Sequence, residues 1–440
     1  MEVHKFGGTC TASREAIDRI VEIILLEQKP LIVTVSAASG VTRFLIDTLN
    51  KPIQEIFVPS IISQLQHIHQ ELRYNSEPLN NFDNDLHKLE RLLYGIIYTE
   101  EITERSRDLV LTFGERLISW IVKERLANKG ILCKCVDPID LLLTDGTHHN
   151  SRILLEETED ECQNYDFSTD VIIVPGFYGI SKSHITTTLG RSGTDYTATA
   201  LGYGFNASAV TIWKDVQGFM TADPQLVNSA KTIASLSYDE AAELSHFGAI
   251  VLHPKCVIPV KLKKIPLWIK NFYDPSIRTK VWTESHKDTT VVKSVSHLSD
   301  LSIIRVFISS GGYTHGILSK LSSTLDQAGT NIYSIASSQT SISFLVNSNE
   351  ISKNVDLVKT SCSDITEAIE IESDIALICM VGSGMGNTHG IAAKVFQAVA
   401  QQNVNVAMIS SGASKAAFNF TVHMNDLGKA LTAIHDEFFS

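Results

Sequence analysis

The sequence predicts an α/β protein with a mainly parallel sheet, followed by a smaller repeated module. Up to about residue 282, short apolar runs alternate with amphipathic stretches, the pattern of strands wound with helices into a parallel sheet. The last third of the chain repeats itself at a constant offset, which indicates two copies of one structural unit. The length of 440 residues is sufficient for two or three domains.

The first predicted unit is a strand, a helix and a second strand. Buried strands are expected at 3–6 and 31–35, with a helix at 14–27 between them whose apolar residues recur at helical spacing. The strand signal returns at 171–175 and 210–213. Further helices are predicted at 111–126 and 238–247, and the polar, helical stretch 51–104 receives no chemical role.

The internal repeat aligns Gly316-Ile317-Leu318-Ser319-Lys320 with Gly390-Ile391-Ala392-Ala393-Lys394. The register continues without a gap through the pairs Gln327 and Gln401, Asn331 and Asn405, Ile335 and Ile409, and Ser337 and Ser411. Each copy is typical of a strand, a Gly-bearing loop, a helix and two strands. We therefore expect domains at 1–285, 300–368 and 373–440, with a linker at 286–299 that is available to pair with the second copy.

Charge and cysteine content exclude several classes of protein. The formal net charge is −12, so the surface as a whole repels nucleic acid and anionic membranes, and any phosphate binding must be local. Seven cysteines lack the spacing of a zinc site or a disulfide framework, which favours a reducing compartment. No apolar leader or membrane-length apolar stretch is visible, so we expect a cytoplasmic protein.

Two Gly-bearing segments carry the candidate chemistry. Lys5-Phe6-Gly7-Gly8-Thr9 follows the first strand and precedes a helix, and so offers a polyphosphate backbone N–H groups, a helix N-terminus and one cation. Alone it is a weak signal, because a Gly-Gly turn is common and the Walker A spacing is absent from the chain. The second segment, 188–196, combines Arg191, suited to a bidentate grip on a carboxylate, with Asp195.

Six motifs in order resemble the aspartate kinase family. They are Lys5 to Thr9, Thr112-Phe113-Gly114-Glu115, Leu189 to Tyr196, Trp213 to Gly218, Thr221-Ala222-Asp223-Pro224, and Phe247 to Pro254. This resemblance spans the chain and implies an amino-acid-kinase fold, a three-layer α/β/α sandwich, followed by two ACT domains of βαββαβ topology. The repeat is what that family would predict.

The resemblance also implies roles for individual residues. The catalytic residues would be Lys5 and Asp195. Aspartate would be bound by Ser36, Thr42, Glu115, Arg191, Ser192 and Gly193, with Glu115 receiving its amino group and Arg191 its α-carboxylate. The nucleotide would be bordered by Lys5, Gly7, Gly8, Thr9, Lys214, Asp215, Met220, Gln225, Ile250 and Val251. An allosteric effector would meet Gly316, Ile317, Tyr333, Ser337 and Ser338.

The implied reaction transfers the γ-phosphoryl group of ATP to the β-carboxylate of L-aspartate and gives 4-phospho-L-aspartate. This is the first step of lysine (diaminopimelate), threonine and methionine biosynthesis. ATP and Mg²⁺ are the expected cofactors, with no metal ligand assigned among the protein side chains. Feedback inhibition through the ACT domains and a homodimer are expected, with lysine as the first candidate effector and threonine, another diamino acid or no effector as open alternatives.

Several positions depart from the family pattern, which usually has KFGGTS, GRGGSD, WTDV, a proline-arginine pair after TAD, and FGAKVLHP. The departures are Cys10, Ser192, Thr194, Lys214, Gln225 and Ile250. Ser192 adds a side chain where backbone must approach an anion. Lys214 is interpreted as a replacement for a cation lost elsewhere.

Three other functions were weighed. A kinase of the same fold could act on glutamate, N-acetylglutamate or a nucleotide, but Glu115 with Arg191 favours a free α-amino acid. A non-catalytic amino-acid sensor would account for the departures, but Lys5, Asp195 and Arg191 are retained. A nicotinamide enzyme is rejected because the glycine run 382–386 lacks a third glycine at the required spacing and lacks the acidic residue that follows in a dinucleotide-binding unit. Since the chain stops soon after the second repeat, no fused dehydrogenase is expected.

Overall fold

A computed structural model describes residues 1–51, 54–74, 77–248, 251–283, 291–309 and 315–439. The chain forms two compact units. The first unit comprises Met1–Phe219, Ala234–Tyr238 and Val251–Ser285, and the second comprises Met220–Ile233, Asp239–Ile250 and His286–Ser440. Within the described residues, no helix has both the length and the apolar character needed to cross a bilayer.

The first unit is built on an eight-stranded sheet of order β3-β5-β2-β1-β8-β10-β11-β9. Neighbouring strands are parallel except β10 and β11. The strands are β1 (Glu2–Phe6), β2 (Leu31–Val35), β3 (Cys133–Cys135), β5 (Val171–Pro175), β8 (Ala209–Lys214), β9 (Ser235–Ser237), β10 (Leu267–Asn271) and β11 (Arg278–Trp282). Every residue of β2 and β5 is buried. A strand buried on both faces needs a continuous apolar run, and such runs made these central strands predictable from the sequence.

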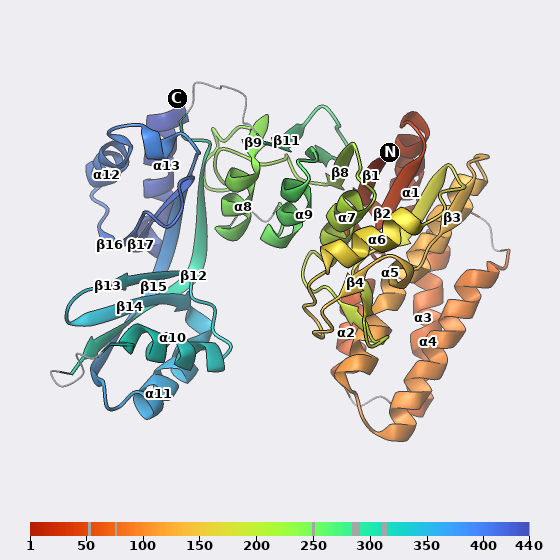
Figure 1. The fold of residues 1–440 in the computed structure, drawn as a ribbon, viewed down its shortest axis with the longest axis horizontal. Coiled ribbons are helices and arrows are strands. Elements are labelled where there is room, and N and C mark those ends of the chain that lie inside the picture. Colours follow the sequence, from red (N-terminus) through yellow and green to blue (C-terminus); the bar gives the residue numbers. More distant parts are fainter. Residues whose placement is uncertain (52–53, 75–76, 249–250, 284–290, 310–314, 440) are drawn as a thin grey trace. The chain divides into compact units, whose positions relative to one another are not determined.

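Helices enclose this sheet (Figure 1). They are α1 (Arg14–Leu26), α2 (Val41–Leu49), α3 (Val58–Glu71), α4 (Asn80–Thr99), α5 (Glu104–Ala127), α6 (Leu155–Asn164), α7 (Gly193–Gly204) and α9 (Val257–Leu262). Helix α8 (Tyr238–His246) belongs to the second unit from Asp239 onward. The helix predicted at 14–27 is confirmed. The helix predicted at 111–126 begins about two turns earlier, at Glu104, where the Thr103 side chain caps it by accepting from the Ser106 N–H. The sequence did not predict these first turns because their charged residues interrupt the apolar period.

The first unit also contains a separate three-stranded sheet of order β4-β6-β7, whose strand β7 contacts α5. Its strands are β4 (Leu143–Thr144), β6 (Tyr178–Ser181) and β7 (Thr186–Thr188). Threonine hydroxyls join β4 to β7, since Thr144 Oγ1 and Thr187 Oγ1 lie 2.7 Å apart in the interior. This small sheet carries the segment that leads into Arg191.

The second unit is a six-stranded antiparallel sheet of order β13-β14-β12-β15-β17-β16. Its strands are β12 (Ser294–Ile308), β13 (Ser334–Ser337), β14 (Ser341–Asn347), β15 (Thr366–Val381), β16 (Val406–Ser410) and β17 (Ala417–His423). Its helices are α10 (Ile317–Gln327), α11 (Ile351–Ser361), α12 (Ile391–Gln401) and α13 (Leu427–Phe439). Helices α10 and α11 pack on the first repeat copy and α12 and α13 on the second (Figure 1).

The expected linker at 286–299 was available to pair with the second copy, and its second half does so as the start of β12. Residues 294–298 pair with 377–381 of β15, and residues 301–307 of the same strand pair with β14. One long strand therefore serves both copies. Its serines concealed it in the sequence: Ser294 and Ser296 are buried, and the Ser294 hydroxyl donates to the Met220 carbonyl at 2.8 Å, which satisfies it in the interior.

Candidate active site

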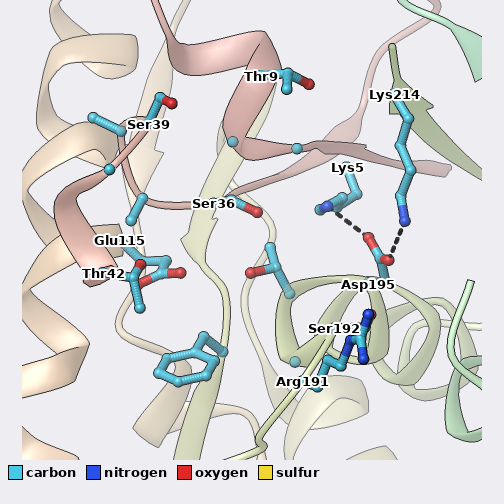
Figure 2. Close-up of a pocket in the computed structure, with 18 of the residues that line it drawn as sticks. Lys5, Thr9, Ser36, Ser39, Thr42, Glu115, Arg191, Ser192, Asp195 and Lys214 are labelled. Carbon is cyan, nitrogen blue, oxygen red and sulfur yellow. Dashed lines mark hydrogen bonds and ion pairs between the residues drawn. The ribbon is translucent and has the colours of Figure 1, made fainter. Parts of the chain in front are cut away.

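A cavity of about 560 Å³ opens in the first unit where β1, β2 and β8 end. Lys5 comes from β1, Ser36 directly follows β2, and Lys214 is the last residue of β8 (Figure 2). Carboxyl ends of neighbouring parallel strands meet at one edge of a sheet, which is where α/β proteins bind ligands. Lys5 and Arg191 line this same cavity.

Two lysines share one buried carboxylate at the cavity floor. Asp195, in the first turn of α7, has Oδ1 2.6 Å from Lys5 Nζ and Oδ2 2.7 Å from Lys214 Nζ. Lys214 also donates to the Val251 carbonyl at 2.6 Å. Burial opposes ionisation of Asp195, but the two lysines outweigh it, so the pKa of its carboxyl lies below the ordinary value. The trio carries a net positive charge, which favours an anionic ligand beside it.

Glu115 presents an unsatisfied carboxylate to the opposite end of the cavity. The side chain is 4% exposed, and its Oε2 has no hydrogen-bond partner among the described residues. Burial raises the pKa of the Glu115 carboxyl to about 8. Gly114 allows this placement, because a Cβ there would lie 2.8 Å from the Ala37 side chain. An orphaned buried acceptor of this kind fits a cationic ligand group.

Arg191 lies on the connection between β7 and α7, with an exposed side chain on the cavity wall. The preceding Gly190 has φ +75°, and a Cβ there would lie 2.7 Å from the His149 carbonyl, so only glycine fits. The departure at Ser192 also adopts a left-handed conformation, with φ 58°, at the N-cap of α7. Its side chain makes no capping hydrogen bond.

The structure brings most of the predicted site residues together. The predicted residues that line this cavity are Lys5, Gly7, Gly8, Thr9, Ser36, Thr42, Glu115, Arg191, Ser192, Gly193, Asp195, Lys214 and Asp215. Met220 and Gln225 do not line it and belong to the second unit. Val251 contributes its carbonyl to Lys214, and Ile250 lies outside the described residues.

Seven residues that line the cavity were given no role from the sequence: Ala37, Ala38, Ser39, Gly40, Phe177, Gly190 and Thr194. Phe177 lines the cavity two residues after β5, in a left-handed conformation with φ 80°. Thr194 also lines it, although the sequence analysis treated it only as a mild departure. The position of Phe177 just beyond the end of a parallel strand was the available signal.

The donors for a metal ion are few. Both oxygens of Asp195 are engaged by lysines, which leaves Asp215 as the exposed carboxylate among the described residues that line the cavity. Outside the cavity, Glu2, His4 and Glu27 lie close enough to hold an ion. However, His4 Nδ1 accepts from Trp213 Nε1 at 3.2 Å, so Nε2 carries the ring proton and faces Glu2.

The predicted effector residues lie on the first repeat copy. Gly316 caps α10 with φ 93°, and Ile317 is the first residue of that helix. Tyr333 donates its backbone N–H to the Leu345 carbonyl, Ser337 ends β13, and Ser338 follows in the turn. Residues 310–314 of the expected effector loop lie outside the described residues. A cavity of about 650 Å³ lies at the equivalent positions of the second copy, including Gly390, Ile391 and Ser411.

Comparisons with known proteins identify the family. Residues 1–271 match the amino acid kinase family, and residues 378–438 match an ACT domain. Aspartokinase 1, chloroplastic, of Arabidopsis thaliana is 31% identical over 99% of this chain and 80% of that protein. The chain belongs to the aspartokinase family. The resemblance inferred from the six motifs is thus confirmed.

Solved aspartokinases have the same fold. Escherichia coli aspartokinase III in complex with aspartate and ADP aligns over 100% of both chains, with a TM-score of 0.85 and 23% identity. The same enzyme in complex with lysine and aspartate aligns with a TM-score of 0.83 and 24% identity, also over 100% of both chains. The predicted α/β fold is therefore confirmed. The chain spans about half the length of the first curated relatives it matches.

Proposed function

We propose that this member of the aspartokinase family transfers the γ-phosphoryl group of ATP to the β-carboxylate of L-aspartate and forms 4-phospho-L-aspartate. The observation that carries the proposal is the shared cavity. Lys5 and Lys214 share the buried Asp195 at one end, and Glu115 lies at the other, with an Oε2 that has no hydrogen-bond partner among the described residues; Arg191 lines the same cavity. A ligand with an anionic phosphate end and an ammonium end satisfies both.

Aspartate would bind through its α-carbon substituents. Arg191 can hold the α-carboxylate by two parallel hydrogen bonds. The ammonium group can approach Glu115, whose second oxygen is free of hydrogen bonds in the described part of the chain. Ser36 and Thr42 line the same cavity and add hydroxyl groups to it (Figure 2). The β-carboxylate is then the free end, directed towards Lys5.

Catalysis would rest on position and charge. A carboxylate is ionised at neutral pH and is itself the nucleophile, so no general base is required. Lys5 would stabilise charge on the transferring phosphoryl oxygens, while Asp195 fixes the direction of both lysine side chains. The nucleotide would bind as its magnesium complex, in which the ion neutralises phosphate charge. Gly7, Gly8, Thr9, Lys214 and Asp215 border the space for the phosphates.

The place of this reaction follows from its product. We propose that it is the first step of lysine, threonine and methionine biosynthesis in the cytoplasm, controlled by an amino-acid effector at the ACT repeat. Lysine is the first candidate because a solved relative binds lysine and aspartate together. A homodimer through the ACT repeats is part of the proposal. Activity measured against added lysine and threonine, with mass followed by light scattering, tests effector and assembly together.

A hydroxylamine-trapping assay tests the function itself. Purified protein with L-aspartate, ATP and magnesium should form aspartyl hydroxamate, whereas glutamate and N-acetylglutamate should give little. Product from glutamate in preference to aspartate would favour another amino-acid kinase. A protein that binds aspartate but forms no hydroxamate would instead be an amino-acid sensor.

A further inference from the structure

Asp108 is a buried carboxylate beneath the substrate cavity that the proposed reaction does not use. It lies on α5 and is 0% exposed. Its Oδ1 accepts from Thr188 Oγ1 at 2.5 Å and lies 2.8 Å from His149 Nδ1. Its Oδ2 lies 2.5 Å from His148 Nδ1 and accepts the His149 backbone N–H at 3.4 Å. A buried charge needs such a set of donors to remain in the interior.

The donors belong to the two segments that support Arg191. Thr188 is the last residue of β7, three positions before Arg191. His149 touches the same turn from the other side, since its carbonyl fills the space that a Gly190 Cβ would need. Its ring is held from both ends, because Nε2 is hydrogen-bonded to Glu104 while Nδ1 faces Asp108. Asp108 therefore anchors the base and the flank of the Arg191 turn.

The same helix carries the other recognition group. Glu115 follows Asp108 by seven residues on α5, which is about two helical turns and therefore the same face. Helix α5 thus presents Glu115 to the cavity and holds the Arg191 turn through Asp108. An α-amino acid carries its ammonium and its α-carboxylate on one carbon atom, so the separation of their two receptors must be fixed closely.

We propose that Asp108 is a positioning residue that sets the separation between Glu115 and Arg191 and thereby the affinity for the α-amino acid substrate. The inference rests on the proposed roles of Glu115 and Arg191. Asp108 is not among the residues that line the cavity and acts through the turn. Asp108 contacts Thr188, His148 and His149, whereas Lys5, Lys214 and Asp195 form a separate ion-pair cluster at the nucleotide end of the cavity.

Asp108→Asn tests this assignment, because the variant keeps the shape and removes the charge and one acceptor. We expect the KM for aspartate to rise about tenfold, since hydrogen bonds to a buried charged group are being lost. The KM for ATP should stay unchanged. Thr188→Val removes a single hydrogen-bond donor to Asp108 at nearly constant volume and should raise the KM for aspartate by a smaller factor. If Asp108→Asn does not fold, Thr188→Val alone tests whether Asp108 positions the Arg191 turn.

Glu124→Gln is the matched control. Glu124 is a carboxylate on the same helix, paired with Arg73 at 2.6 Å and remote from the turn, so this variant should leave both KM values unchanged. An unchanged KM for aspartate in Asp108→Asn and Thr188→Val would overturn the inference, as would equal increases in both KM values. A wild-type protein that does not phosphorylate aspartate would instead overturn the proposed function.

Discussion

Lys5 Nζ lies 2.6 Å from Asp195 Oδ1, although the two residues are far apart in the sequence. Both are almost fully buried. The second carboxylate oxygen is taken by Lys214 at 2.7 Å. This shared carboxylate places two cations at the end of the parallel sheet and holds them at fixed positions.

Lys5→Ala should lower kcat by about two to three orders of magnitude, because a charge partner of the transferring phosphoryl group is lost. Aspartate binding should persist, since Arg191 and Glu115 are untouched. Hydroxamate formation measures the rate, and calorimetric titration measures the binding. Near-normal turnover in a pure sample would contradict the role of Lys5.

Lys214→Thr should weaken ATP binding about tenfold, because one charge-assisted contact to phosphate is removed. The aspartate KM should change little. Lys270→Thr is the control: Lys270 lies on β10, next to β8, and packs over the Trp213 ring outside the cavity. If ATP affinity were the same in wild type and Lys214→Thr, Lys214 would have no role as the second phosphate-binding cation.

Asp195→Asn should cost about 3–5 kcal/mol of unfolding free energy near neutral pH, because two buried lysines lose their counter-ion. The pKa of Asp195 is lowered in the folded state, so its stabilisation is present above the ordinary value of 3.8 and is lost as the pH falls through the folded pKa. Urea unfolding of the wild type and Asp195→Asn, measured from neutral to acidic pH, should show that their difference in unfolding free energy narrows only at acidic pH. A constant difference down to the most acidic pH would contradict this assignment.

Aspartate binding at pH 7 should release roughly one proton from Glu115, because a nearby ammonium lowers a carboxyl pKa that burial has raised to about 8. Titration calorimetry in buffers of different ionisation enthalpy measures the release, and Glu115→Gln should abolish it. The pKa of Glu115 is also higher in the folded protein, at about 8, than its ordinary value of 4.5 in the unfolded chain. As the pH rises from about 4.5 to about 8, the unfolded chain therefore loses this proton while the folded protein keeps it. The free energy of unfolding of the ligand-free wild type, relative to Glu115→Gln, should fall over this range. Binding without proton uptake or release would remove Glu115 as the ammonium receptor.

The sequence alone determined the elements that carry the cavity. Lys5 lies one residue before the end of the strand predicted at 3–6, and Lys214 directly follows the strand predicted at 210–213. A parallel sheet brings such ends to one edge, so their meeting could be expected. The segment 191–195 was assigned to the same site as these lysines only because the ordered motifs resemble those of a known family. The central strands and α1 could be predicted from local sequence, because a buried strand appears as a continuous apolar run and a helix as apolar residues at helical spacing.

Tertiary structure decided the rest. The start of β12 was not predicted because Ser294 and Ser296 look like loop residues in the sequence, although both are buried in the structure. The first turns of α5 were not predicted because their charged residues interrupt the apolar period. Met220 and Gln225 follow a cavity-lining strand in the chain yet fold into the second unit. Asp108 shows the reason most plainly: a single acidic residue in a helix carries no signal until folding surrounds it with Thr188, His148 and His149.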